Sequence, residues 1–138
     1  MSNENNKTIA RRFFLEAFSQ GKLELLDELL AADYVDHNAP PGTPPGVESI
    51  RYLLSTFRAA FPDVQFTVED QVAEGDKVVT RYTFRGTHQG ELFGIPATGK
   101  AVVFPGISIY RMQAGKMQEA WVNYDMMGMM QQLGVIPA

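Results

Sequence analysis

The sequence predicts an α+β domain in which a cone-shaped, curved antiparallel sheet wraps around N-terminal helices. Two observations carry this prediction. Before Pro62 the apolar residues recur at the three-to-four spacing of amphipathic helices, and after it they recur at every second position, as in half-buried strands. The predicted strands follow one another through tight turns, so we expect neighbours in sequence to pair antiparallel, with the helices packed on one face.

The first part of the chain contains three predicted helices, which span residues 7–19, 23–31 and 47–60. In the first of them, Ile9, Phe13, Ala17 and Phe18 form the stripe expected to face the core. Four prolines and two glycines occur within residues 33–46. Because these residue types interrupt regular structure, this segment is predicted to be a loop.

The second part contains four predicted strands and a short terminal helix, at residues 64–68, 78–86, 101–112, 117–125 and 126–134. Pro105 and Gly106 lie inside the third strand, where they predict an edge position or a bulge that bends the sheet and leaves a conical pocket. Both faces of residues 101–111 are largely apolar. One face can cover the core, and the other predicts a homodimer that packs sheet against sheet.

The composition limits the function classes. A chain of 138 residues with 45% hydrophobic and 20% charged residues is expected to form one domain over residues 1–138. The net charge of -4 and the lack of a basic stripe argue against nucleic-acid binding. The absence of cysteine excludes disulfides and thiol nucleophiles. The polar N-terminus and the lack of a long apolar run predict a cytoplasmic protein that is not bound to a membrane.

Three familiar motifs fail. The stretch "GIPATGKA" begins like a phosphate-binding loop, but Ala101 stands where a Ser or Thr is needed, and the stretch leads into a strand. His37 and His88 are not part of a metal-ligand spacing, so no metal site is predicted. Asp36 beside His37 would need distant ligands to complete a site. No G-x-S-x-G elbow supports a hydrolytic serine.

The stretch "EAWVNYD" contains a group of residues that could form a functional site. Strand alternation places Glu119, Trp121, Asn123 and Asp125 on one face. An exposed tryptophan would be unfavourable, so we interpret this face as the wall of a pocket, with Trp121 as its apolar part and the polar groups directed at a ligand. This ligand is predicted to be a small apolar or aromatic molecule that carries carbonyl groups.

Asp125 has two compatible roles. It can cap the helix that follows it, or it can act as a general base whose pKa is raised by an apolar setting. Glu119 is expected to pair with Arg81 or Arg111. Arg81 can orient a carbonyl group or pair with an acid. His37, at the mouth of the proline-rich loop, and His88, at a strand end, are predicted to be structural or to join the pocket.

The stretches "YVDHN", "FPD", "RGTHQGELFGIPATGK", "GISIYRM" and "EAWVNYD" resemble the SnoaL-like polyketide cyclase, or ester cyclase, family. This family belongs to the nuclear transport factor 2-like superfamily. The resemblance runs from about residue 7 to residue 135, and its most specific element is Trp121-x-x-x-Asp125. It implies a cone of curved sheet and three helices. It also implies an intramolecular aldol ring closure without metal or cofactor, in which Asp125 takes the position of the family's catalytic aspartate.

The sequence departs from the pattern of this family at one position. The characterised cyclases carry a histidine on the preceding strand, which here reads "FPGISIYRM", and His37, Arg81 or His88 would have to replace it. Two other function classes stay open. One is a non-catalytic module that binds a small molecule. The other is a different pocket enzyme, either an isomerase with a tyrosine or acid donor opposite its base or an epoxide hydrolase with an Asp-Arg-Asp array.

Overall fold

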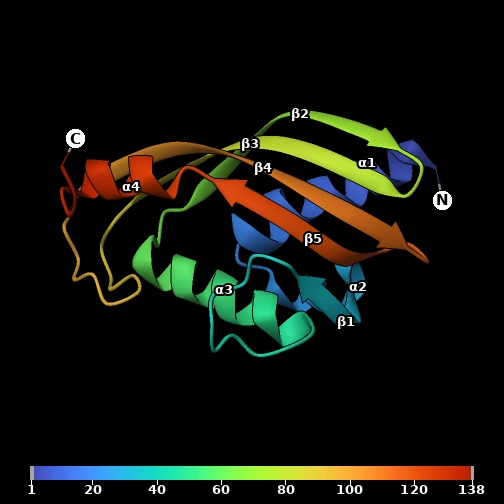
Figure 1. Cartoon of the computed structure of the whole chain (residues 1–138), viewed down its shortest axis with the longest axis horizontal. Helices are drawn as coiled ribbons and strands as arrows, with labels where there is room; N and C mark the ends of the chain where they lie inside the picture. The colour runs from blue at the N-terminus through green and yellow to red at the C-terminus, as the bar shows by residue number, and fades with distance from the viewer. Residues whose placement is uncertain (1, 138) are drawn as a thin grey trace.

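The computed structural model describes residues 2–137, which form five strands and several helices (Figure 1). The elements are α1 (Asn3–Arg12), η1 (Phe13–Phe18), η2 (Leu23–Leu25), α2 (Leu26–Leu29), β1 (Leu30–Asp36), α3 (Val47–Ala60), β2 (Gln65–Glu74), β3 (Lys77–Thr87), β4 (Ala101–Gln113), β5 (Lys116–Tyr124) and α4 (Met126–Leu133). Among these residues, no helix has the length and apolar character needed to cross a membrane.

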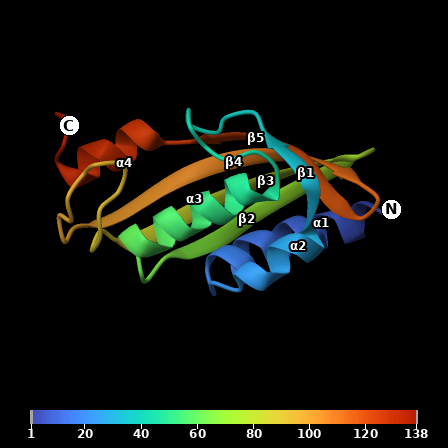
Figure 2. The ribbon, with the colours of Figure 1, turned by 90° about the horizontal axis from the view of Figure 1, so that it is seen from below.

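The strands form one sheet in the order β1-β5-β4-β3-β2. Strands β2 to β5 pair antiparallel with their sequence neighbours. Helices α1 and α3 lie on the same face of this sheet (Figures 1 and 2). The predicted α+β class is therefore confirmed, and α3 occupies the predicted residues 47–60.

Strand β1 corrects the prediction in two ways. Residues 33–36 were expected to lie in a loop, but they complete this strand, and it pairs parallel with β5. The sheet is therefore not purely antiparallel, and one strand precedes α3. The second predicted helix is shorter than expected, because the chain is already extended at Leu30. By pairing with β5, β1 covers an edge that would otherwise stay open.

The first helix is longer than predicted and is not a regular α-helix throughout. It begins at Asn3 because the Ser2 side chain accepts a hydrogen bond from the Asn5 backbone N–H at 3.1 Å. From Phe13 it continues as a π-helix. This wider turn directs the buried rings of Phe13 and Phe14 onto the sheet, where the Phe14 ring lies 4.7 Å from that of Tyr82.

Pro105 lies in a central strand, so the predicted edge or bulge at this position is wrong. The register with β3 runs unbroken through Thr83↔Pro105 and Tyr82↔Gly106. The Pro105 carbonyl faces β5 and accepts a hydrogen bond from the Asp125 N–H at 3.0 Å. The missing Pro105 N–H would point to the same side, towards Asp125, whose carbonyl instead accepts the Met129 N–H at 3.0 Å as α4 begins.

Gly106 is required by the ring that crosses it. A Cβ atom at this position would lie 2.4 Å from Cε2 of Tyr82. Gly106 faces the helices and is buried, as are its neighbours Phe104 and Ser108 on the same side of β4. The absence of a side chain lets Tyr82 lie flat across the middle of the sheet.

Helix α4 covers the part of β4 that extends beyond β5. The Gln132 side-chain amide accepts from the Val103 N–H and donates to the Val103 carbonyl, both at 2.8 Å. This side-chain amide makes the two backbone hydrogen bonds that a residue of a neighbouring strand would otherwise make. The helix ends at Gly134, which adopts a positive φ of 80° that favours glycine.

We expect Gly106→Ala to lower the free energy of unfolding by about 1–3 kcal/mol, the usual range for overpacking a core. Urea denaturation measures this change. The reason is the steric conflict with Tyr82, so the effect should be much smaller in a Tyr82→Ala background. An additive double-mutant cycle would show that this conflict is not the cause.

Candidate functional site

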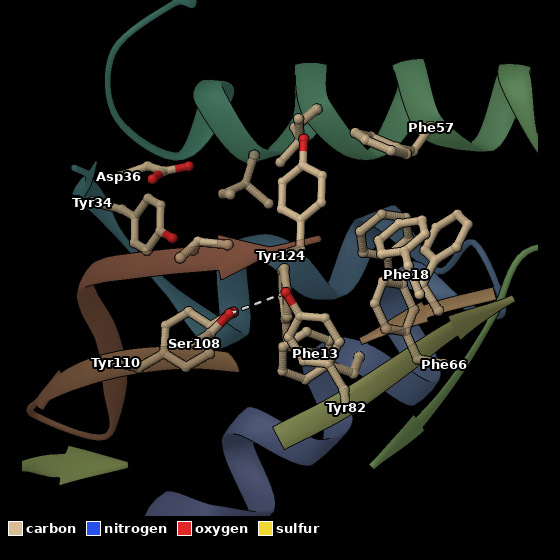
Figure 3. Close-up of a pocket in the computed structure, with 16 residues that line it drawn as sticks. Phe13, Phe18, Tyr34, Asp36, Phe57, Phe66, Tyr82, Ser108, Tyr110 and Tyr124 are labelled. Atoms are coloured by element: carbon tan, nitrogen blue, oxygen red, sulfur yellow. Dashed lines mark hydrogen bonds between the residues drawn. The ribbon is translucent and has the colours of Figure 1, made fainter. Parts of the chain in front are cut away.

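An aromatic cavity lies between the sheet and the helices (Figure 3). The space between its lining atoms is about 520 Å³, a figure that includes a part open to solvent. Its apolar wall comes mainly from seven phenylalanines, Phe13, Phe14, Phe18, Phe57, Phe66, Phe84 and Phe104. Such a wall suits a flat, largely apolar ligand.

The polar groups of the cavity come from strands β1, β3, β4 and β5. They are the carboxylate of Asp36, the hydroxyl of Ser108 and the hydroxyls of Tyr34, Tyr82, Tyr110 and Tyr124. Asp36 is the one charged residue that lines this cavity within the described part of the chain. A few hydroxyls and one acid in an aromatic container are typical of sites that orient and deprotonate a small molecule.

The environment of Asp36 favours its protonated form. Burial raises the pKa of its carboxyl group, and a hydrogen bond from the Asn38 N–H at 2.8 Å opposes this effect in part. Burial is also the main cause of the raised pKa of all four tyrosines, and the charge of Asp36 contributes to each. The pKa of Tyr124 rises to about 12. The phenols therefore stay neutral and act as hydrogen-bond donors.

A second, more polar hollow adjoins the cavity. Asp36 and Leu53 line both spaces. The outer hollow lies among the proline-rich loop 39–43, Thr56 on α3 and Phe93. Asp36 is thus positioned between the aromatic cavity and an adjoining hollow whose lining includes the hydroxyl groups of Thr43, Ser49 and Thr56.

The prediction that Trp121 lines the cavity is wrong. Trp121 lies on the opposite face of β5, whereas Val122 and Tyr124 point into the cavity. The His37 ring stacks on Trp121, with centroids 4.8 Å apart and an angle of 11° between the ring planes. This stacking covers apolar surface that we had expected only a pocket to cover.

Glu119 and His37 belong to the same outer cluster and not to the cavity. Glu119 accepts hydrogen bonds from His37 Nε2 at 2.6 Å and from Arg111 Nε. These two partners, His37 first, lower the pKa of Glu119. The predicted pairing of Glu119 with an arginine is confirmed, with Arg111 as the partner.

Arg81, Asn123 and Asp125 meet in a shallow depression on the outer face of the sheet. Arg81 is exposed there and forms a bidentate pair with Asp70, with contacts of 3.1 and 2.9 Å. Asp125 caps α4 by accepting from the Gly128 N–H at 2.8 Å. The predicted cap is confirmed. The predicted placement of these side chains in the enclosed cavity is wrong.

His88 is fully buried, as its structural interpretation requires, and does not line the aromatic cavity. Its Nδ1 accepts a hydrogen bond from the Thr98 N–H at 3.2 Å, and its ring packs against Phe61. His88 therefore holds the loop between β3 and β4. Within residues 2–137, no three His, Asp or Glu side chains come together as a metal-binding group.

The polar cavity residues that sequence reasoning missed are Asp36 and the four cavity tyrosines. A signal for three of them was present. Tyr82 alternates with the buried Phe84 on β3, Tyr110 with the buried Phe104 on β4, and Tyr124 with Ala120 on β5. Asp36 gave no such signal, because its strand was read as a loop.

Comparison with known proteins points to one family. The sequence profile of the SnoaL-like polyketide cyclases matches residues 8–133. The aklanonic acid methyl ester cyclase DnrD of Streptomyces peucetius is 28% identical over 126 residues, which cover 89% of this chain and 87% of DnrD. TsrD from Streptomyces laurentii has a similar structure, with a TM-score of 0.91, 29% identity and 99% of each chain covered. IdmH from Streptomyces antibioticus also has a similar structure, with a TM-score of 0.81 and 37% identity, and the match covers 94% of this chain and 98% of IdmH.

Acidification should stabilise the wild-type protein relative to Asp36→Asn. The folded pKa of Asp36 is raised above its ordinary value of 3.8, so the charged carboxylate destabilises the fold at pH values above the folded pKa. This penalty disappears as the pH falls through the folded pKa towards 3.8. Urea denaturation of both proteins between about pH 7 and 4 measures the difference. A constant difference would contradict the burial of a titrating Asp36.

Proposed function

This chain belongs to the SnoaL-like polyketide cyclase family, and from that premise we propose that it closes a carbon ring in an aromatic polyketide-type substrate. The relative DnrD is named for the cyclisation of aklanonic acid methyl ester, a substrate of this kind. We propose the same reaction type for this chain, an intramolecular aldol addition that takes place in the aromatic cavity.

One observation carries the proposal: Asp36 is the only charged group on the wall of the aromatic cavity within the described residues. A carboxylate that is partly removed from water is a stronger proton acceptor than an exposed one. The carbon between two carbonyl groups is acidic enough for such a base. The surrounding rings exclude water from the reacting carbons.

The proposed reaction is balanced within the substrate and Asp36. The carboxylate removes a proton from the carbon beside a carbonyl group and leaves an enolate. This carbon then attacks a second carbonyl carbon of the same molecule, which forms the new C–C bond and an alkoxide. The Asp36 carboxyl returns the proton to the alkoxide. The main contribution of the cavity wall is to hold the chain folded so that the two carbons meet.

Asp125 is the alternative base, since the family resemblance assigns that role to its position. Its carboxylate lies at the end of β5, in the outer depression, where it caps α4. A catalytic Asp125 would require the substrate to reach that depression. We therefore prefer Asp36, and the two carboxylates can be tested against each other.

A second candidate function is the isomerisation of an unsaturated ketone. An isomerase needs one base that moves a proton between two carbons and a neutral donor for the carbonyl oxygen. Asp36 with the cavity tyrosines meets this need. The epoxide hydrolase alternative is less well supported, because Arg81 pairs with Asp70 on the outer face. A pure binding module would retain ligand affinity without turnover.

We expect Asp36→Asn to lower the rate of ring closure by about two to four powers of ten, the usual contribution of a general base. Aklanonic acid methyl ester is the first test substrate, with the product followed by chromatography. Asp125→Asn is the matched control, because asparagine caps a helix about as well as aspartate and should leave the rate unchanged. The opposite pattern, with loss only in Asp125→Asn, would assign the base to Asp125.

We also propose that the protein forms a homodimer through the outer face of its sheet. Val103, Pro105 and Ile107 are exposed along the outer side of β4, with exposed fractions of 48% for Val103 and 47% for Ile107. Arg81, beside this strip, is paired with Asp70 within the chain, and Arg85, opposite Val103 on β3, donates to the Thr67 hydroxyl. A strip on the central strand can meet its own copy across a two-fold axis.

Ile107→Glu is expected to convert the dimer to a monomer, because it places a charge at the centre of the contact. Light scattering coupled to size-exclusion chromatography measures the change. Tyr52→Glu on α3 is the control, since Tyr52 is similarly exposed but lies away from the outer face of the sheet. A wild-type protein that is monomeric at high micromolar concentration would contradict the dimer.

A further inference from the structure

The Tyr34 hydroxyl is the one cavity hydroxyl whose oxygen is fully buried without a hydrogen-bond partner among residues 2–137. Tyr34 is 1% exposed, and its Oη has no hydrogen-bond partner among residues 2–137. A buried hydroxyl without a partner is unfavourable by roughly 1–3 kcal/mol. The fold tolerates this cost at a residue that lines the cavity, and Figure 3 shows the hydroxyl turned towards the middle of that space.

The other hydroxyls offer a contrast. The Ser108 hydroxyl donates to Tyr82 Oη in a long hydrogen bond of 3.5 Å, so these two groups partly satisfy each other. The Thr80 hydroxyl, on the same side of β3, accepts from the Gln71 amide at 3.2 Å. Tyr34 stands apart because it is both buried and unpaired.

Tyr34 and Asp36 are also correctly placed to act on one molecule. They lie two positions apart on β1, so their side chains leave the same face of the strand roughly 6.6 Å apart. The carbon acid of a ketone and its carbonyl oxygen are two bonds apart. A ligand can therefore present its C–H bond to Asp36 while its oxygen faces Tyr34.

We propose that the Tyr34 hydroxyl donates a hydrogen bond to the carbonyl oxygen of the substrate and holds the charge that develops there as the enolate forms. This inference rests on the proposed function and assigns a second group to it. Burial and the neighbouring Tyr110 and Asp36 raise the pKa of Tyr34, which keeps the phenol protonated. A neutral donor gains strength as the oxygen becomes negative, so its effect is larger in the transition state than in the ground state.

Fluorenone is a suitable probe, because it is a flat aromatic ketone and has no hydrogen that Asp36 could remove. Its carbonyl stretching band should shift to lower wavenumber when it binds the wild-type protein. In Tyr34→Phe the shift should be lost, and the dissociation constant should rise roughly five- to tenfold, as for the loss of one neutral hydrogen bond. Tyr52→Phe is the matched control and should keep the shifted band, because Tyr52 is an exposed residue of α3 that does not line the aromatic cavity.

A second measurement separates a ligand-binding hydroxyl from a structural one. Tyr34→Phe removes an unpaired buried group, so its urea midpoint should equal or exceed that of the wild type. A clear fall in the midpoint would show that the hydroxyl serves the fold and would overturn the inference. So would a wild-type protein that does not bind fluorenone or binds it without a band shift, and so would a shifted band that is kept in Tyr34→Phe.

The probe also keeps this inference distinct from the proposed function. The fluorenone band does not depend on turnover, and Asp36→Asn should leave it shifted. A normal band response without any ring closure by the wild type would contradict the cyclase proposal alone. Ring closure that depends on Asp36, together with an unshifted band, would contradict the role of Tyr34 alone.

Discussion

The cavity depends on the register of β4, the strand that pairs with a neighbour on each side for most of its length. Its inward residues include two small ones, Gly106 and Ser108, between the large rings of Phe104 and Tyr110. Phe104 stacks on Phe84 at 4.5 Å, and Gly106 accommodates the Tyr82 ring. A shift by one residue would turn every one of these side chains outward. The Tyr82 ring fills the space above Gly106, and Ser108 and Tyr82 both line the cavity.

Much of this arrangement could be predicted from the sequence. The change of period near Pro62 separates helices from strands, and all four predicted strands are present. Alternation alone, however, shows which residues share a face and not which face is buried. In β5 the presence of Trp121 led us to expect its face to line the pocket, although the opposite face carries Ala120, Val122 and Tyr124. The interactions that cover Trp121 come from His37, 84 positions earlier, and no local pattern reports them.

Strand β1 was even harder to predict from its local sequence. Its local sequence, "LAADYVD", is followed by prolines and glycines and lacks a clear alternation. It becomes a strand because β5 offers a free edge, and the Asn38 side chain extends the pairing by accepting from the Val122 N–H at 2.6 Å. Tertiary context therefore decides its state. Asp36 and Tyr34 are brought into the cavity by this distant pairing, which explains why the sequence pointed to Asp125 instead.

The attachment of α4 by Gln132 has a consequence for how the molecule behaves among its own copies. Beyond the end of β5, β4 presents the N–H and C=O groups of Val103 on a side where no further strand is available. Unpaired backbone groups of this kind can recruit an extended segment from another molecule, which is how runaway fibrillar association begins. One side-chain amide occupies both groups. The terminal helix thus protects the protein against aggregation. In a chain whose α4 has detached, this part of β4 would become an open strand edge.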